Sequence, residues 1–417
     1  MTLTPPRLVV RTREIDHVED LLPFTSPHDP TAWIRRGDGM AAVGEAFSLR
    51  QRGDQAYAAL AAQWKRLSAA ADIDDPVGLP GTGLIAFGAL AFDPRSAHDS
   101  VVRVPSVVVG RRGGRSWVTT IHHDGERPAE ATETPYGTHW SGTLGPGEQS
   151  PEGYLAAVRA GLDAIAAGEV GKVVLARDLG GTVPGGSDLR RLARALGSDY
   201  PDTWMFAVDG LIGASPETLV TVHAGTVTAR VLAGTTPRGA DADADTAAAS
   251  TLASSTKDLD EHEFAVQSVL ASLRPHLRAL AASDAPFTLK LPNVWHLATD
   301  VEGELSGAAS ALDLVRALHP TAAVAGTPTD AAIELIHRLE PFDRGRYAGP
   351  VGWIDARGDG EWAIALRCAQ FDTVATADGA DIPVTAYAGA GIVADSDPET
   401  ELIETRVKFR PIVDALA

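Results

Sequence analysis

The stretch Lys172-Val173-Val174-Leu175-Ala176-Arg177-Asp178-Leu179 reads as a strand, because it is a short, mostly apolar run rich in branched side chains. A helical pattern precedes it from Pro151 to Gly168, and another follows from Ser187 to Leu196. Apolar runs over 204–208 and 219–222 predict two more strands. Helices and strands therefore mix without strict alternation, which predicts an α+β fold with a large mixed or antiparallel sheet.

Further out, residues 7–122 carry apolar runs such as Leu84 to Phe87 and Val101 to Val109, which we expect to be strands. The polar segment 123–153 is expected to be a surface loop and the one visible seam. It separates an N-terminal part, residues 1–150, which completes the sheet scaffold, from residues 151–417, both within one integrated domain. The same patterns predict helices from Ser255, over 308–318 and over 330–337, strands over 351–355 and 362–371, and a closing helix from Pro398.

Charge and composition exclude several classes of protein. The chain has 417 residues, of which 44% are hydrophobic and 22% charged, and its formal net charge is −19. This composition is typical of a globular fold, and the negative charge argues against nucleic acid or a membrane surface as a partner. The single cysteine, Cys368, excludes an internal disulfide, and Met1 to Arg7 lacks an apolar signal core. We therefore expect a cytoplasmic protein.

Glycine-rich and histidine-containing segments do not support nucleotide or zinc chemistry. Gly389-Ala390-Gly391-Ile392-Val393-Ala394 matches a dinucleotide pattern, but the remaining residues look helical and leave no room for the second strand that this pattern needs. Gly168 to Lys172 is too short for a phosphate-binding loop, and the twelve histidines form no zinc motif. These glycines could still let the backbone approach another ligand closely.

Two pairs of acids remain as candidates. Asp258 and Glu261 lie three residues apart on one predicted helix, and Glu401 and Glu404 repeat this spacing on the closing helix. One interpretation is structural, because acids near a helix start are favoured by the helix dipole, with Ser255 and Asp397 as caps. The other is that two facing helices hold a divalent cation, and carboxylates with retained waters suit Mg²⁺.

Several segments in fixed order resemble the chorismate-utilising enzymes, the family of isochorismate, salicylate, anthranilate and aminodeoxychorismate synthases. The resemblance covers about residues 150–417 and is specific because the succession of motifs is kept. Its carriers are Lys172 to Arg177, Ser215-Pro216-Glu217, Leu232 to Gly239, Lys257 to His262, His319 to Gly326, Gly389 to Ile392, and Pro398 to Lys408.

The resemblance implies an α+β sandwich of large, mostly antiparallel sheets flanked by helices. It also implies that Glu261 and Glu404 bind Mg²⁺, with Asp258 and Glu401 as an outer pair. Ala233 replaces the lysine of the aminodeoxychorismate branch. Ala323 resembles isochorismate synthases, whereas salicylate and ammonia-using members tend to carry threonine there.

By motif position, Lys172 is the general base and Glu217 the general acid of the implied reaction. Taken alone, Lys172 could be a lysine that protects a sheet edge, and Glu217 a turn residue after Pro216. We expect both groups to be enclosed, because burial favours the neutral forms that these roles require. The resemblance also implies substrate contacts by Gly234, Thr235, His296, Ala323, Tyr347, Arg367, Gly389, Gly391 and Lys408, although His296 could equally be a core histidine.

The sequence thus predicts a Mg²⁺-dependent isochorismate synthase acting on chorismate, for menaquinone or siderophore synthesis. A salicylate synthase and a non-catalytic chorismate-binding module are the alternatives. Because Cys368 is expected to be buried, it cannot serve as an amidotransferase nucleophile. We expect a monomer without an amidotransferase subunit.

Overall fold

Two large sheets dominate the computed structural model, which describes residues 6–290, 294–307, 309–373 and 379–417. The side chains of Thr235, Pro237, Lys257, Glu261 and Val294 are outside this description. Almost all strand pairs are antiparallel, and β1 with β5 is the parallel pair among the described strands. The sheets pack together through β12, β6 and β20. This confirms the predicted α+β sandwich.

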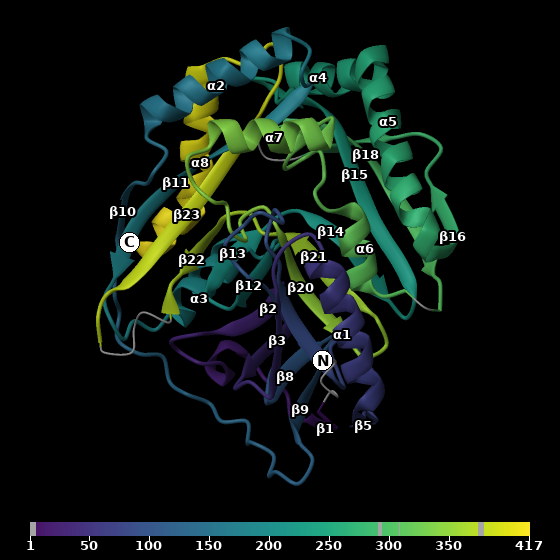
Figure 1. Ribbon diagram of the computed structural model, residues 1–417, viewed down its shortest axis with the longest axis vertical. Coiled ribbons are helices and arrows are strands. Elements are labelled where there is room, and N and C mark those ends of the chain that lie inside the picture. Colours follow the sequence, from purple (N-terminus) through teal and green to yellow (C-terminus); the bar gives the residue numbers. More distant parts are fainter. Residues whose placement is uncertain (1–5, 291–293, 308, 374–378) are drawn as a thin grey trace.

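The first sheet runs from β10 and β11, in the middle of the chain, through the C-terminal strands β23 and β22 to the N-terminal strands (Figure 1). In spatial order its described strands are β10 (Thr143–Pro146), β11 (Lys172–Val183), β23 (Ile382–Ile392), β22 (Cys368–Phe371), β13 (Leu211–Ser215), β12 (Trp204–Val208), β2 (Thr31–Arg35), β3 (Asp38–Val43), β8 (Val107–Arg112), β9 (Arg115–His123), β1 (Leu8–Ile15) and β5 (Asp72–Asp74), and β19 (Gly326–Thr327) pairs with β11.

The second sheet also joins strands from both parts of the chain. Its described strands are, in order, β16 (Leu277–Ala282), β18 (Val294–Leu305), β15 (Thr226–Pro237), β14 (Thr218–His223), β21 (Gly360–Ile364), β20 (Pro350–Asp355), β6 (Ile85–Ala89), β7 (Ser100–Val104) and β4 (Phe47–Gln51), and β17 (Phe287–Lys290) pairs with β18. Because β2 pairs with β12 and β6 with β20, strands from before and after residue 150 share both sheets.

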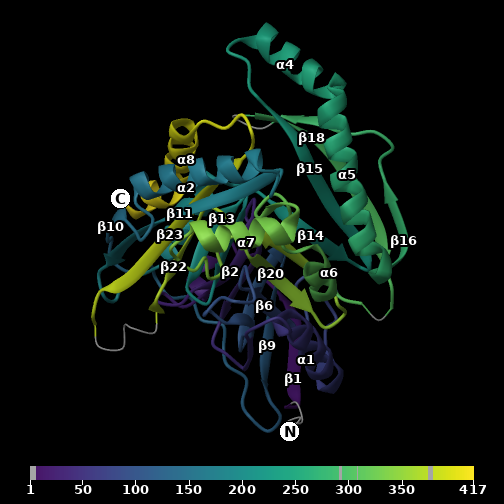
Figure 2. The ribbon, with the colours of Figure 1, turned by 45° about the horizontal axis from the view of Figure 1, so that its top comes forward.

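Helices cover two separate ends of this frame. The described helices are α1 (Ala56–Ala70), α2 (Pro151–Ala166), α3 (Arg190–Asp199), α4 (Ala242–Ser254), α5 (Thr256–Leu273), α6 (Ala311–Leu318), α7 (Thr329–Leu339) and α8 (Pro398–Leu416), with short 3₁₀ helices η1 (Leu22–Phe24) and η2 (Arg274–His276). Helices α2 and α8 lie on β11 and β23, whereas α4 and α5 run along β15 and β18 (Figures 1 and 2). We call α4, α5 and the strands β15 to β18 the arm.

A buried carboxylate links the two sheets inside the core. Glu361 of β21 accepts hydrogen bonds from the indole nitrogens of Trp33 and Trp353, at 3.0 and 3.2 Å. Its other oxygen pairs with Arg112 of β8 at 2.8 Å. Trp33 and Arg112 belong to the first sheet and Trp353 to the second, so these bonds satisfy the charge and connect both layers.

Two predicted strands are each divided between the sheets. The expected strand over 362–371 is β21 followed by β22, which lie in different sheets. Arg367 lies between them with a φ of 49°, a left-handed conformation that interrupts a strand. The run Val101 to Val109 is likewise β7 and β8, separated around Pro105. Because both runs are mostly apolar, their hydrophobic pattern does not indicate where the chain passes from one sheet to the other.

Other differences concern helices. The prediction of strands over residues 7–122 missed α1, whose buried residues recur with helical spacing. The expected helix over 187–196 is α3, which begins three residues later, and the helix over 308–318 begins at Ala311 behind a capping box of Ser310 and Asp313. The alanine- and aspartate-rich tract at 240–249 forms most of α4. The loop over 123–153 contains the strand β10.

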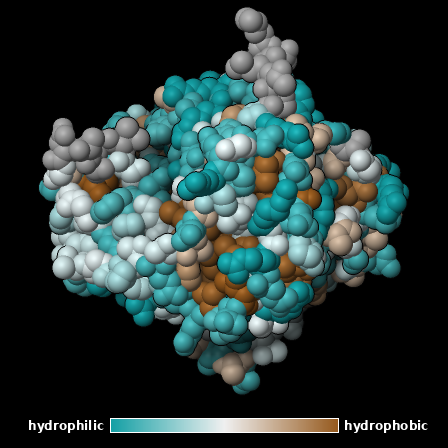
Figure 3. Space-filling model, turned by 90° about the horizontal axis from the view of Figure 1, so that it is seen from below, coloured by the Kyte–Doolittle hydropathy of each residue, from teal (hydrophilic) through white to brown (hydrophobic). Residues whose placement is uncertain are grey.

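Among the described residues, no helix is both long and apolar enough to cross a bilayer. Seen from below, the molecule is largely hydrophilic, with apolar side chains gathered in limited patches (Figure 3).

Candidate active site

Two of the points where the chain crosses between the sheets lie side by side. One crossing joins β13 to β14 and contains Glu217, and the other joins β21 to β22 and contains Arg367. Backbone hydrogen bonds tie them together, since Ile364 N donates to Glu217 O at 3.0 Å and Ala214 N donates to Arg367 O at 3.1 Å. The predicted acid and the predicted carboxylate-binding arginine therefore occupy one seam between the layers.

Glu217 has the environment that a general acid needs. Burial raises the pKa of its carboxyl group, and the nearby cations Lys172, Lys408 and Arg367 oppose this rise only in part. Its backbone N–H donates to Ser215 Oγ at 3.2 Å, which fixes the start of the crossing. Glu217 is therefore more than a residue of a surface turn. Its carboxyl group interacts electrostatically with three of the predicted site residues.

Lys172 begins β11 and does not protect a sheet edge. Its strand pairs with β23 on one side and with β19 on the other, where Lys172 itself is opposite Thr327. The lysine side chain lies over Gly391, because a Cβ added there would come within 3.1 Å of Lys172 Cε. A side chain at Gly391 would therefore press on the predicted base.

Buried side chains complete the edge of β11 between β19 and β10. Glu340 accepts a hydrogen bond from Ala176 N at 2.7 Å, and Arg344 donates to Val174 O at 2.8 Å. The two side chains, only 2% and 3% exposed, also pair with each other at 2.5 Å. They replace the missing ladder partners of the strand that carries Lys172, a function that the sequence prediction missed.

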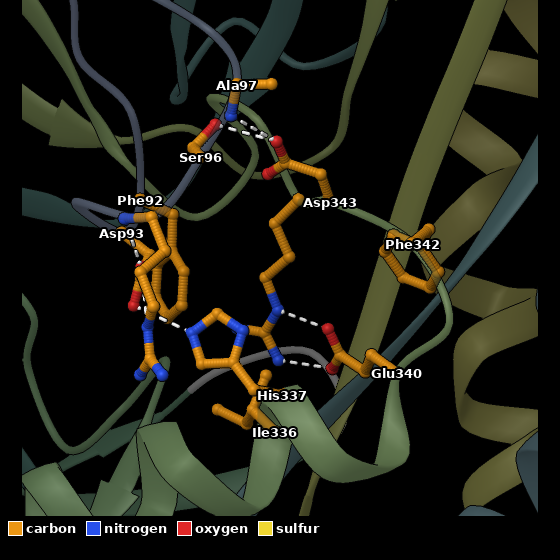
Figure 4. A pocket seen from close by; sticks show the side chains of 11 residues that line it. Phe92, Asp93, Ser96, Ala97, Ile336, His337, Glu340, Phe342 and Asp343 are labelled. Atoms are coloured by element: carbon orange, nitrogen blue, oxygen red, sulfur yellow. Dashed lines mark hydrogen bonds and ion pairs between the residues drawn. The ribbon is translucent and has the colours of Figure 1, made fainter. Parts of the chain in front are cut away.

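A cavity of about 240 Å³ lies beside this ion pair (Figure 4). The polar side chains that line it interact with one another. Asp93 pairs with His337 at 3.0 Å, and Asp343 accepts a hydrogen bond from Ser96 Oγ at 2.9 Å. None of the predicted site residues lines it. This cavity therefore belongs to the support behind β11 and is separate from the candidate active site.

Helix α8 contributes an acid and a cation to the site. Lys408 Nζ donates to Gly389 O at 2.7 Å and pairs with Glu404 at 2.5 Å. One turn earlier, Glu401 is buried, and burial together with Glu404 raises the pKa of its carboxyl group against the opposing effects of Ser396 and Lys408. Asp397 caps this helix by accepting from Thr400 N at 2.9 Å.

Tyr347 and Arg367 lie close to this group. Tyr347 is buried and stacks on Tyr387 with ring centroids 5.2 Å apart. A Cβ at Gly389 would come within 3.2 Å of its hydroxyl oxygen. Burial lowers the pKa of Arg367, and Tyr347, Glu404 and Glu217 counteract that effect. The arginine consequently stays a cation at neutral pH within reach of both the acid and α8.

The opposite wall is formed by the arm. Gly234 forms a β-bulge in β15 with a φ of 77°, and its neighbour Thr235 pairs in register with His296 of β18. A Cβ at Gly234 would lie 3.3 Å from Asp258 Cβ. Burial lowers the pKa of His296, a hydrogen bond to the Gly234 backbone raises it, and Lys172 lowers it further. His296 thereby links the arm electrostatically to the predicted base.

The four predicted metal ligands are only partly described. The side chain of Glu261, like that of Thr235, lies outside the described residues. Among the side chains that the structure does describe, no group of three or more His, Cys, Asp or Glu residues could hold a metal ion. Asp258 lies beside Gly234, whereas Glu401 and Glu404 lie on α8. Ser255 also caps α5 through Asp258 N, at 3.3 Å, so the capping interpretation holds for the helix start.

Two further residues named from the sequence, Ala323 and Cys368, can be located in the structure. Ala323 is exposed in the turn between α6 and β19, close to where Val174 N donates to Ala325 O at 2.9 Å. It therefore lies near the beginning of β11. Cys368 is buried in β22, as predicted.

Comparisons with known proteins agree with this arrangement. The sequence profile described as chorismate binding enzyme matches residues 4–417. Isochorismate synthase DhbC of Bacillus subtilis is 42% identical over 278 residues, which cover 64% of this chain and 68% of the relative. The salicylate biosynthesis isochorismate synthase of Pseudomonas aeruginosa is 31% identical over 452 residues, covering 100% of this chain and 91% of the relative.

A solved structure shows the same fold. The menaquinone-specific isochorismate synthase MenF of Escherichia coli superposes with a TM-score of 0.74, at 23% identity and with 98% of this chain and 95% of that chain covered. The chain belongs to the chorismate-binding enzyme family. This confirms the resemblance predicted from the ordered motifs.

Proposed function

We propose that this chain is a Mg²⁺-dependent isochorismate synthase that converts chorismate to isochorismate. The observation that carries this proposal is the meeting of Glu217 with Lys172, Lys408 and Arg367 at the seam between the sheets. A half-buried acid among three cations suits a reaction that needs both proton transfer and recognition of a dianion. The relatives named above support the same activity.

The proposed reaction adds water at C2 of chorismate and removes the hydroxyl group from C4. Neutral Lys172 takes a proton from the attacking water, whose oxygen bonds to C2. The ring double bonds shift, the C4–O bond breaks, and protonated Glu217 gives its proton to the departing hydroxide. One water enters and one leaves, so the net change is an isomerisation. The raised pKa of Glu217 supports its part, because the acid must hold its proton near neutral pH.

Substrate recognition falls to the cations of the seam. Arg367 would bind the enolpyruvyl carboxylate, since a guanidinium can pair with both oxygens at once. The ammonium group of Lys408 donates to Gly389 O and pairs with Glu404. These two contacts hold it beside β23. Tyr347, His296 and the backbone around Gly234, Gly389 and Gly391 would complete the enclosure. This explains how a protein with a net charge of −19 could bind a dianion.

Magnesium would be held by Glu261 and Glu404, with Asp258 and Glu401 behind them. The donor chemistry fits, because Glu401 is a buried carboxyl group beside a second carboxylate, an arrangement that a divalent cation favours. When bound, the ion would neutralise and orient the ring carboxylate of the substrate.

The product would enter menaquinone or siderophore synthesis, and the enzyme would act as a monomer without an amidotransferase subunit.

Product analysis tests this proposal. Purified protein is incubated with chorismate, with and without Mg²⁺, and the products are separated by chromatography. We expect isochorismate alone, and only when Mg²⁺ is present. Salicylate with pyruvate would instead identify a salicylate synthase, and binding of chorismate without turnover would identify a non-catalytic module.

A further inference from the structure

A buried histidine connects the arm helix to the β-bulge of the site. His262 lies on α5, one residue after Glu261 and one turn after Asp258, and is 1% exposed. Its Nδ1 lies 3.0 Å from Ala233 O, and its Nε2 lies 2.7 Å from Thr299 Oγ1. The ring thus joins three elements: α5, β15 and β18.

The partners determine which ring nitrogen carries hydrogen in the neutral ring. A carbonyl oxygen can only accept, so Nδ1 must donate to Ala233 O. In the neutral ring Nε2 then accepts from the hydroxyl group of Thr299, which is itself buried. Both nitrogens of His262 are therefore satisfied, and neither is available for substrate.

The contact with Ala233 lies immediately before the bulge at Gly234. The bulge shifts the pairing of β15 with β18 between Ala233 and Thr235, and Asp258 packs against Gly234 one helical turn before His262. The first part of α5 is therefore fixed to the bulge at two points. These points set the rotation of the helix about its axis.

We propose that His262 is a positioning residue that holds Asp258 and Glu261 in register with the Gly234 bulge, so that the arm presents its acids correctly to Mg²⁺. This inference rests on the proposed function. A helix with few buried side chains needs such a link: Val266 and Leu273 are buried on α5, whereas Phe264 is 69% exposed. Residues behind metal ligands commonly change metal affinity by about 10- to 100-fold when they are replaced.

Two substitutions separate the two nitrogens of the ring. In His262→Asn the side-chain amide can occupy the place of Nδ1 and keep the bond to Ala233 O. In His262→Gln the amide reaches the place of Nε2 and keeps the contact with Thr299 while losing the one with Ala233. Thr299→Val removes the hydroxyl partner and leaves the bond to Ala233 intact, so it is the matched control.

Mg²⁺ binding is measured by calorimetry on the full-length protein with saturating chorismate, in a Lys172→Ala background so that substrate is not consumed. We expect His262→Gln to weaken Mg²⁺ binding about tenfold, and His262→Asn and Thr299→Val to stay within about threefold of the background. Equal Mg²⁺ affinity for the Gln and Asn variants would overturn the proposal. Thermal unfolding of each variant verifies folding.

Three further outcomes remain decisive. If His262→Gln does not fold, a tenfold loss of Mg²⁺ affinity in His262→Asn or Thr299→Val overturns the proposal, and retained affinity in both supports it. In the active background, the Mg²⁺ concentration for half-maximal rate should rise for His262→Gln while KM for chorismate stays within about twofold. Absence of isochorismate from the unsubstituted enzyme would refute the proposed function alone, because the calorimetric comparison does not depend on the product.

Discussion

The two walls of the candidate site are built differently. On the β11 wall, the strand is paired on both sides, packed against α2 and α7, and completed by the buried Glu340–Arg344 pair. On the arm wall, α4 has only Asp245 and Leu252 buried, and the carboxylate of Asp245 holds Arg238 at 2.5 Å and Trp295 Nε1 at 2.9 Å. The hydrophobic core reaches both walls, through Val173 and Leu175 of β11 and through Val231 and Val266 of the arm, but the outer helix of the arm, α4, is held mainly by these polar contacts.

This difference matches the separate tasks of the walls. Proton transfer needs fixed geometry between base and acid, and Lys172 and Glu217 lie on the well-packed side. Mg²⁺ demands near-ideal octahedral geometry but keeps several of its waters, so the arm needs to place only one or two carboxylates. The substitutions below should therefore have their greatest effects in the well-packed wall and its seam, and their smallest on the outer face of the arm.

The largest effect is expected at the base and the acid. Lys172→Ala and Glu217→Gln should each lower kcat by about 10²- to 10⁴-fold with little change in KM, because each removes a proton-transfer group. Steady-state kinetics measure this, with Glu130→Gln in an exposed loop as the control. Activity near that of the unsubstituted enzyme in either variant would reject the assigned function of that residue.

The pH dependence of the unsubstituted enzyme tests the acid separately. Because burial raises the pKa of Glu217, its proton is kept at higher pH than in a free glutamate and is lost as the pH rises through the raised value. We expect kcat to fall in that direction. A rate that does not change on the alkaline side of this value would contradict Glu217 as the acid.

The support of β11 should be the next most sensitive feature. Glu340→Gln leaves the Arg344 cation buried without its countercharge, and we expect a loss of about 3–5 kcal/mol in the free energy of unfolding. Urea denaturation measures it. Glu334→Gln on α7, the helix that ends just before Glu340, breaks the exposed pair with Arg95; it is the matched control and should cost less than about 1 kcal/mol. Equal losses would show that the well-packed wall does not depend on its buried pair.

A smaller effect is expected at the hairpin between β12 and β13. Burial alone would raise the pKa of Asp209, but the Arg50 and Arg346 guanidinium groups outweigh it and lower that pKa to about 2. The depressed value means that ionised Asp209 stabilises the fold above pH 4, and that this contribution is lost as the pH falls toward 2. Asp209→Asn should cost about 2 kcal/mol near neutral pH and little near pH 2. A pH-independent cost in urea denaturation would contradict this.

The smallest effect is expected on the outer face of the arm. Arg230 of β15 pairs with Asp300 of β18 at 2.6 Å, but both side chains are about half exposed. Arg230→Ala should change the unfolding free energy by no more than about 0.5 kcal/mol and leave kcat unchanged. A loss as large as that of Glu340→Gln would remove the distinction between the two walls.

Local patterns predicted much of the fold. Strand 172–179 was identified from its apolar run and extends to Val183 in the structure, and the caps Ser255 and Asp397 were placed correctly. The division of 362–371 could not be seen, because the run is apolar on both sides of Arg367 and the left-handed conformation of that residue has no signal in the sequence. The strands β15 and β18 were missed because threonine, alanine and acids interrupt their hydrophobic pattern.

The geometry of the candidate site could be anticipated only in part. Ordered motifs identified Lys172, Glu217, Arg367 and Lys408, which the structure brings into electrostatic range of one another. His262, Glu340 and Arg344 were missed because their partners are backbone atoms far away in sequence. The spacing of Glu340 and Arg344, four residues apart, was a visible signal, but nothing in the sequence showed that both would be buried.

The paired crossings have a consequence for catalysis. Since Glu217 and Arg367 are joined through Ile364 and Ala214 by backbone hydrogen bonds, the backbone fixes the spacing from which the proposed proton donor and the proposed anion-binding group extend. A ligand whose carboxylate and leaving group are farther apart or closer together than in the substrate would then contact only one of the two residues, Glu217 or Arg367. Selectivity for molecular length would then come with the topology itself.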